Sequence, residues 1–309
     1  MHHLDLLACP LTGSALRRTG DALVGATGHR YSVTPSGIPL FAEQHCSEDA
    51  KRQQAHYDRV AAAYIASLAY PHTLEYMDYL DTAFLDAVGD APLDTVAEIC
   101  CGTGEAFRLL GSRVGRGVGV DISVAMLEAA VSARENPRLE FTQGDATRLP
   151  LRSGAFDAVF MFGGIHHVND RQKLFGEIAR ILKPGGRFYW REPVSDFWLW
   201  RALRAVIYRL SPALDHATER PLLYEETVPV LQAAGLRPLQ WRTYGFFGFC
   251  LFMNSDVLIF NRAFRFIPGI RRLTRWAAAL DDRITRTPTM GNAGLQVIGC
   301  AEKPRGEPA

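Results

Sequence analysis

The chain has 309 residues, of which 48% are hydrophobic and 22% charged, and its formal net charge is +1. This composition indicates a globular protein, and the near-zero charge gives no general attraction to nucleic acid or membranes. The first residues lack the basic and apolar segments of a signal peptide, and no run of about 18 apolar residues suits a membrane span. The six cysteines have no CxxC spacing, which indicates reduced thiols. We therefore expect a cytoplasmic protein.

The sequence divides into three parts. Residues 1–45 hold short β-prone runs bounded by Gly or Pro, as in "ALVGATGHRYSVTPSGIPLF", and indicate a small β-rich module. Residues 46–90 are predicted to form a helical cap, because Ser47 is an N-cap candidate with acids in the turn that follows. Residues 91–309 form the main domain.

Strand and helix patterns alternate along the main domain. Strand candidates occupy residues 95–100, 116–122, 139–145, 156–163 and 187–193, with helix candidates at 104–112, 124–134 and 171–182. The stretch 224–241 indicates a last helix leading to a strand, and 294–304 indicates a closing strand. Nearly continuous apolar runs are typical of strands covered on both faces. The pattern predicts an α/β fold with a mostly parallel sheet and helices on both faces.

The stretch "VAEICCGTGEAFRLL", residues 96–110, has the strand, glycine turn and helix of a nucleotide-binding loop. A dinucleotide loop needs a third glycine where Phe107 stands. The Glu98 carboxylate would repel phosphate but could pair with an ammonium. S-adenosylmethionine carries an ammonium and no phosphate. Asp121 is placed to accept from its ribose hydroxyls and Asp145 from its adenine amino group, although either aspartate could instead be a helix cap.

The motifs "VAEICCGTG", "GVGVDIS", "GDATRLPL", "FDAVF" and "RILKPGGRFY" follow one another in this order. Residues 50–195 thereby resemble the class I S-adenosylmethionine-dependent methyltransferases, most of all the type 11 group of quinone and small-molecule enzymes. The resemblance implies a Rossmann-like sheet of seven strands and release of S-adenosylhomocysteine. Cys100 departs from the family pattern, which has glycine there. The cofactor-binding residues that the resemblance implies are Glu98, Cys100, Gly102, Gly104, Asp121, Ile122, Asp145, Ala146 and Phe162.

The segment "GIHHVND" follows a predicted strand, where ligands of open parallel sheets bind. His166 or His167 could take a proton from an acceptor as the methyl group transfers, and we favour His166; both could instead brace the loop. Tyr57 and Tyr64 are placed like the aromatic residues of the N-terminal helix that cover the cofactor in the family. Substrate or lid roles are also expected for Arg191 and Glu192, which end the fifth predicted strand, and for Trp198 in the expected lid. Helix packing is the alternative for the tyrosines, and a structural ion pair is the alternative for Arg191 and Glu192.

Two later segments bear on the acceptor. Residues 196–290 are rich in aromatic residues, and the resemblance implies a lid insertion at about 196–222. An apolar lid suggests a hydrophobic small-molecule acceptor. Residues 261–286 hold seven arginines and two aspartates, with apolar residues at helical spacing. This basic amphipathic segment could contact a membrane surface or an anionic group, or it could be a solvated basic helix.

The first module resembles a Trm112-like zinc ribbon through "LLACP" and "GIPLF". The intact module binds zinc through paired cysteines, whereas here Cys9 stands with Thr12 at its partner position. Cys9 with His29 supplies too few ligands, so we predict a degenerate module without metal. Such a module could buttress the main domain or form a homodimer contact.

The sequence therefore predicts a methyltransferase that uses S-adenosylmethionine and no metal. The expected acceptor is a hydrophobic small molecule such as a natural-product intermediate, a quinone-like ring or a lipid, methylated on oxygen or carbon; nucleic acid is not expected as a partner. Two alternatives stay open. One is an enzyme that binds the same cofactor but catalyses a cyclisation, and the other is a non-catalytic methyltransferase-like subunit.

Overall fold

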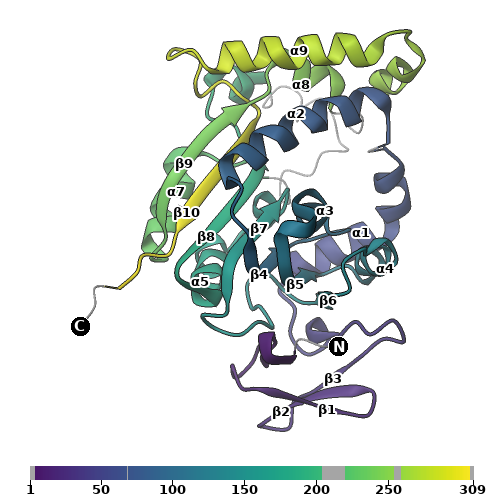
Figure 1. Ribbon diagram of the computed structural model, residues 1–309, viewed down its shortest axis with the longest axis vertical. Coiled ribbons are helices and arrows are strands. Elements are labelled where there is room, and N and C mark those ends of the chain that lie inside the picture. The colour runs from purple at the N-terminus through teal and green to yellow at the C-terminus, as the bar shows by residue number, and fades with distance from the viewer. Residues whose placement is uncertain (1–3, 68, 204–219, 254–258, 307–309) are drawn as a thin grey trace.

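The computed structural model describes residues 4–67, 69–203, 220–253 and 259–306, with the side chains of 60–67 and 259–260 excepted. A seven-stranded sheet runs through it in the order β6-β5-β4-β7-β8-β10-β9 (Figure 1). β10 is antiparallel to both of its neighbours, and the other neighbouring pairs are parallel. The fold class predicted from the sequence is confirmed. The strands are β4 Leu93–Ile99, β5 Val114–Asp121, β6 Leu139–Gln143, β7 Phe156–Phe162, β8 Leu182–Pro193, β9 Arg237–Tyr244 and β10 Gln296–Glu302.

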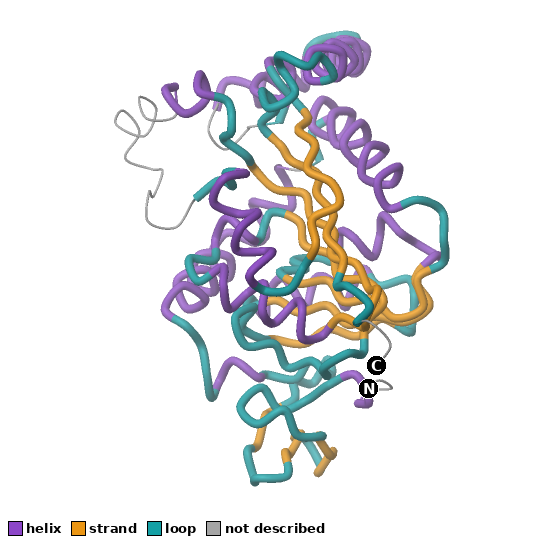
Figure 2. The backbone as a smooth tube through the Cα atoms, turned by 90° about the vertical axis from the view of Figure 1, so that its left-hand side faces the viewer, coloured by secondary structure: helices purple, strands orange, loops and turns teal. Residues whose placement is uncertain are grey.

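Helices cover both faces of the strongly twisted sheet (Figure 2). Ala97 and Val159 point to a core completed by α5 Arg171–Ile181 and α7 Tyr224–Ala233. Val96 and Phe160 point to the opposite core. Alternate residues of one strand thus enter different cores, which explains the continuous apolar runs. The second core is covered by α2 Pro71–Val88, α3 Glu105–Leu110, α4 Val124–Ala133, α8 Phe247–Phe252 and α9 Ile270–Thr285.

Residues before α1 Glu48–Ser67 form a small antiparallel sheet with the strands β1 Leu16–Thr19, β2 Ala22–Gly25 and β3 Arg30–Ser32. The chain after this sheet runs along the edge of β6, where Leu40 pairs in parallel with Gln143 and the Gln143 N–H donates to the Pro39 carbonyl at 2.9 Å. Phe41 and Tyr31 are buried in the same core as the central sheet. The module therefore closes an edge that would otherwise present unpaired backbone groups.

The cysteine of the first module is packed inside it. Cys9 is buried, and its Sγ lies 3.0 Å from the Tyr31 hydroxyl. Over the described residues, no group of three or more His, Cys, Asp and Glu side chains is placed to hold a metal ion. Within that same part of the chain, no helix is both long and apolar enough to cross a bilayer.

The expected lid at 196–222 is described at its two ends, and residues 204–219 lie outside the described residues. Where the segment begins and ends, it is fixed to the domain. Val194 pairs with Leu222, and the buried Trp200 donates its indole N–H to the Ala293 carbonyl at 2.6 Å. Part of the aromatic content that suggested a substrate lid is therefore core.

Candidate functional site

A cavity of about 370 Å³ opens at the carboxyl ends of β4, β5 and β7. Strand order runs outward from β4 in two directions, to β5 and β6 on one side and to β7 and β8 on the other. Ligands of doubly wound sheets bind at such a switch point. The cavity is lined by α1 and α2 and by the loops at 100–103, 144–147 and 162–168; α2 lies above these loops in Figure 1.

The Glu98 carboxylate lies at the base of this cavity and is buried. Its two oxygens accept the backbone N–H groups of Ala106 at 2.8 Å and Phe107 at 3.1 Å, in the first turn of α3. An ionised carboxylate has about four acceptor positions. In the ionised form two positions therefore stay available, and a ligand's ammonium, which favours that form, would complete them.

The glycine loop turns back on itself through three residues with positive φ, which are Cys100 at +53°, Gly102 at +50° and Gly104 at +80°. Gly102 and Cys100 line the cavity, whereas Gly104 starts α3 and is not among the lining residues. A side chain at 104 would touch the Phe141 ring at 3.4 Å. Cys100 thus occupies a left-handed conformation that suits glycine.

Replacing Cys100 with glycine is expected to increase the free energy of unfolding by about 1 kcal/mol, because glycine adopts this φ without strain. Cofactor affinity should change less than about threefold, since the cofactor-facing backbone groups stay in place. Chemical denaturation and calorimetry measure the two quantities. Cys100→Ala is the matched control, because it removes the thiol but keeps the strain. Equal destabilisation of both variants would contradict the argument.

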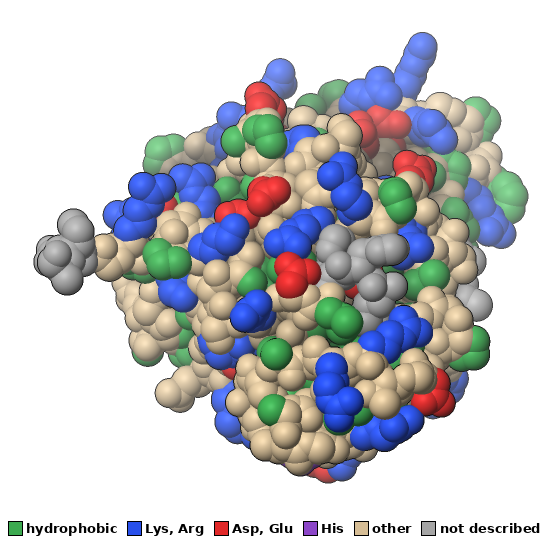
Figure 3. Space-filling model, turned by 60° about the horizontal axis from the view of Figure 1, so that its bottom comes forward, with side chains coloured by type: hydrophobic (Ala, Val, Ile, Leu, Met, Phe, Trp, Pro, Cys, Tyr) green, Lys and Arg blue, Asp and Glu red, His purple; other side chains and the backbone are tan. Residues whose placement is uncertain are grey.

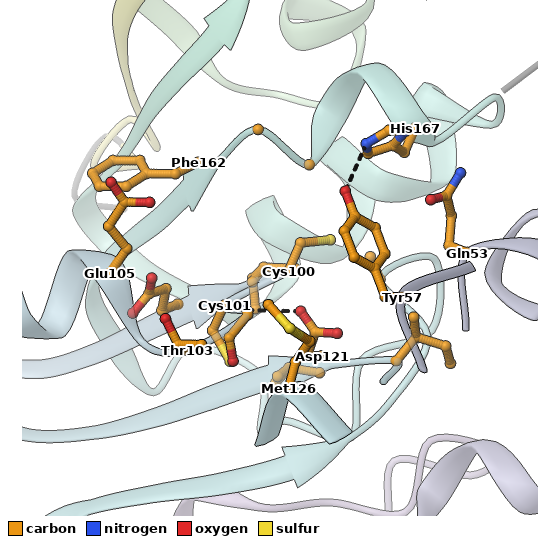
Figure 4. Close-up of a pocket in the computed structure, with 18 of the residues that line it drawn as sticks. Gln53, Tyr57, Cys100, Cys101, Thr103, Glu105, Asp121, Met126, Phe162 and His167 are labelled. Atoms are coloured by element: carbon orange, nitrogen blue, oxygen red, sulfur yellow. Dashed lines mark hydrogen bonds between the residues drawn. The ribbon is translucent and has the colours of Figure 1, made fainter. Parts of the chain in front are cut away.

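Asp121 ends β5 and holds the loop from the other side. Its Oδ2 accepts the Gly102 N–H at 2.8 Å (Figure 4), and its Oδ1 accepts the Ser123 N–H at 2.9 Å. The carboxylate lines the cavity with Ile122, and its side of the cavity is where ribose hydroxyls would find an acceptor. Ser123 caps α4 by accepting the Met126 N–H.

The Asp145 carboxylate accepts more hydrogen bonds from the protein itself than the sequence suggests. It accepts the Ser47 N–H at 2.7 Å, and also the Thr147 N–H at 2.8 Å and hydroxyl at 2.7 Å. Burial works to raise the pKa of Asp145, but these donors hold it below its ordinary value. Asp145 and Ala146 line the cavity, and Asp145 also ties this loop to the start of α1.

The two histidines have different surroundings. Glu192 is completely buried and accepts the N–H groups of Gly164 at 2.6 Å and Ile165 at 2.8 Å, and its Oε2 lies 2.8 Å from His166 Nδ1. His166 is therefore held by the loop-bracing carboxylate and is not among the cavity-lining residues, whereas His167 is. Our preference for His166 as the base does not match this placement.

Tyr57 extends from α1 across the cavity toward His167 (Figure 4). Its hydroxyl lies 3.2 Å from His167 Nε2, and both side chains line the cavity. The side chain of Tyr64 lies outside the described residues. Trp198 is 69% exposed and is not among the lining residues.

Arg191 lies behind the cavity rather than on it. Its guanidinium is buried, pairs with Asp81 and Glu105 at 2.5 Å each, and covers the Phe162 ring at 4.5 Å from the centroid. Burial acts to lower the pKa of Arg191, yet the two carboxylates raise it above its ordinary value. The cavity is lined by Asp81, Glu105 and Phe162, so Arg191 fixes three lining residues at once.

Sequence reasoning missed the contribution of α2. Leu74, Met77, Asp78 and Asp81 all line the cavity. Their spacing of three, one and three residues places them on one helical face, and this pattern was readable in the sequence. The pattern alone does not predict a contribution to the site, because nothing in the sequence shows which face of a cap helix points toward the glycine loop.

The cofactor-free protein should become less stable as pH rises from about 4.5 to about 8. Burial raises the pKa of the Glu98 carboxyl from 4.5 to about 8, although the two N–H donors oppose this shift. Since the folded state binds this proton more tightly than the unfolded chain, the group's stabilising contribution is full below its unfolded pKa and is lost as pH rises through the folded value. Thermal unfolding of wild type and Glu98→Gln across this window measures it. The variant should show a flatter profile, and identical profiles would contradict the assignment.

A cavity with three buried carboxylates, at the switch point of a doubly wound sheet, suits a nucleoside with an amine-bearing tail. The Glu98 and Asp121 carboxylates fit S-adenosylmethionine. A family model described as "Methyltransferase domain" matches residues 97–190. The match leaves out residues 1–45, whose likeness to a zinc ribbon stays a prediction.

Curated relatives agree with this match. The demethylmenaquinone methyltransferase of Renibacterium salmoninarum is 36% identical over 140 residues, which are 41% of this chain and 57% of the relative, so the chain spans little more than half of that protein. The demethylmenaquinone methyltransferase of Beutenbergia cavernae is 31% identical over 175 residues, which are 53% of this chain and 72% of the relative. The chain belongs to the class I S-adenosylmethionine-dependent methyltransferases.

Solved structures share the fold. A chain from the complex between the Haloferax volcanii Trm112 methyltransferase activator and a methyltransferase superposes with a TM-score of 0.56. The two chains are 22% identical, and the match covers 83% of this chain and 99% of the other. At this identity the similarity establishes the architecture and leaves the acceptor to be inferred from the cavity.

Proposed function

We propose that the protein transfers the methyl group of S-adenosylmethionine to a hydrophobic small molecule with a reduced-quinone or phenol ring. The observation that carries the proposal is the mixed lining of the cavity. Besides the cofactor-side carboxylates, it presents Leu74, Met77, Phe162 and Val168 together with the Tyr57–His167 pair. An apolar surface with a few convergent polar groups suits an apolar ring that bears a hydroxyl. The similarity to demethylmenaquinone methyltransferases supports the same acceptor class.

The residues then have separable tasks. S-adenosylmethionine supplies a methyl group on a sulfonium and is released as S-adenosylhomocysteine. A carbon or oxygen of the acceptor ring provides the electron pair of the new bond, while the pair of the broken carbon–sulfur bond stays on sulfur. The acceptor's proton passes to the His167 imidazole, which Tyr57 orients. Glu98, Asp121 and the glycine loop hold the donor in line, and this alignment provides much of the rate.

The test uses S-adenosylmethionine with a labelled methyl group and three acceptors. These are a short-chain prenylated naphthohydroquinone kept reduced, a simple phenol and a water-soluble amine. We expect label in the organic extract with the hydroquinone or phenol, and product NMR then distinguishes carbon from oxygen methylation. Faster labelling of the amine would refute the proposed acceptor class. Acceptor conversion without label would instead indicate the cyclisation alternative.

Replacing His167 with glutamine is expected to lower kcat about 100-fold, at the low end of what a positioned base contributes. Cofactor affinity should stay within about threefold, because the carboxylates that hold the cofactor are unchanged. His29→Gln is the control, since His29 lies in the small N-terminal module and is not among the cavity-lining residues. Kinetics with the best acceptor measure the effect. A variant with wild-type kcat would show that methyl transfer needs no base here.

A further inference from the structure

The end of the molecule opposite the small N-terminal sheet is formed by α9, which lies over α2 and α8 (Figure 1). The residues that α9 buries are small or polar apart from one: Ile270, Thr274, Ala278, Asp281 and Thr285. Its larger apolar side chains point away from the protein. Trp276 is 64% exposed, Leu273 is 48% exposed and Leu280 is 40% exposed. Their spacing of three and four residues aligns them in one stripe.

Both aspartates of the helix are used within the protein. Asp281 is buried and accepts the Tyr76 hydroxyl at 2.6 Å and the Phe246 and Phe249 N–H groups at 2.8 and 3.0 Å. Asp282 pairs with Arg286 at 2.5 Å. Because one acid is buried and the other is paired, the unpaired exposed charges of the helix are positive.

Arginines adjoin the apolar stripe. Arg271, Arg272 and Arg283 are exposed, and among the described residues no ion pair is formed by any of them. Arg272 is four residues before Trp276 and Arg283 is seven residues after it. With 3.6 residues per turn, both arginines therefore lie next to Trp276 on the helix surface. Just before the helix, Phe266 is 74% exposed and Ile267 is also exposed. The α9 outer face, defined as Leu273, Trp276 and Leu280 with Arg272 and Arg283, thus combines apolar and cationic groups without an acid.

We propose that the α9 outer face binds the surface of an anionic lipid bilayer. An apolar stripe with tryptophan enters the boundary between headgroups and acyl chains, and flanking arginines pair with anionic headgroups. Arginine stems can lie along apolar surface while their charged ends stay at the headgroups. The proposal concerns this surface and does not depend on the methyl acceptor.

The charges argue against a second copy as the occupant. In a symmetric dimer the same patch meets itself, so Arg272 and Arg283 would face arginines of like charge. An acidic polypeptide could satisfy the cations, but it would not explain the exposed row of Leu273, Trp276 and Leu280. On the face that carries the N-terminal sheet, hydrophobic side chains form small separate patches, which is the ordinary appearance of a protein surface (Figure 3).

Sedimentation with sucrose-loaded vesicles tests the proposal. Vesicles of phosphatidylcholine with one part in about three of phosphatidylglycerol should carry the wild type down at low salt, and pure phosphatidylcholine should carry little. Arg272→Gln with Arg283→Gln should weaken binding roughly 25-fold, since each arginine near an anionic surface contributes about a factor of five. The matched control is Arg17→Gln with Arg18→Gln, two exposed arginines on β1 at the far end of the molecule.

A second variant separates the lipid from an acidic partner. Trp276→Ala with Leu280→Ala removes apolar area but no charge, and it should also weaken vesicle binding while leaving thermal unfolding within a few degrees of wild type. No sedimentation of the wild type with anionic vesicles would overturn the proposal. So would α9 variants that bind as tightly as wild type. Binding to polyglutamate as tight as to vesicles, insensitive to the Trp276 and Leu280 change, would assign the face to an acidic polypeptide instead.

Discussion

Replacing Arg191 with leucine is expected to lower the free energy of unfolding by about 3 kcal/mol. The guanidinium is 6% exposed and lies between Asp81 and Glu105, so its removal leaves two carboxylates close together without a cation. Removing one member of a buried ion network costs about 3–5 kcal/mol. We expect the low end, because the carboxylates keep some contact with water, at 30% and 27% exposure. Urea unfolding measures the change.

The matched control for this prediction is Arg187→Leu, on the same strand. Arg187 is about half exposed and contacts Glu302 at 3.8 Å, and exposed pairs of this kind contribute at most about 1 kcal/mol. A small effect at both positions would show that Asp81 and Glu105 do not depend on the guanidinium. Burial already raises the pKa of Asp81 against the pull of Arg191. The Arg191 variant should therefore lose less stability under mildly acidic conditions, where Asp81 takes up a proton.

Replacing Glu98 with glutamine is expected to weaken S-adenosylmethionine binding at least about 100-fold. The variant loses the negative charge that would pair with the cofactor's ammonium inside the protein, and breaking such a pair costs about 3–5 kcal/mol. A glutamine also cannot accept both the Ala106 and Phe107 N–H groups on two oxygens, as Glu98 does. Isothermal titration calorimetry measures the affinity, with the exposed Glu135→Gln as control.

The choice of ligand separates the two parts of this effect. Methylthioadenosine has the nucleoside and sulfur but no amino acid group, so it should bind wild type and Glu98→Gln with similar affinity. S-adenosylhomocysteine keeps the ammonium and should lose as much affinity as S-adenosylmethionine. If methylthioadenosine lost affinity equally, the substitution would be acting through the loop, and Glu98 would have no specific role toward the amine.

Local patterns in the sequence were sufficient for the central sheet. Continuous apolar runs and the glycine turn identified β4, β5, β6, β7 and β8, because each pattern depends on neighbouring residues. Short-range patterns do not reveal which distant side chains meet. Asp281 on α9 accepts N–H groups from the start of α8, a contact across more than 30 residues that no periodicity indicates.

The same limit explains the histidine pair. The sequence places His166 and His167 after the end of β7. The side chains of neighbouring residues point in different directions, and the backbone conformation of the loop determines which one points to the cavity. Glu192, on β8, binds His166 and so leaves His167 to the cavity. The sequence indicates both Glu192 and the histidines, whereas their pairing depends on the parallel register of β7 and β8.

The position of β10 has a consequence for the order in which the protein can form. In the part of the chain that the structure describes, β9 pairs with β10 alone, and β10 lies between it and β8. During synthesis, residues 237–244 leave the ribosome some fifty residues before 296–302. β9 must therefore wait, with its backbone donors bound to water, while β4 to β8 can already pair. The cofactor cavity, built on β4, β5 and β7, can take shape on the nascent chain before the sheet is complete.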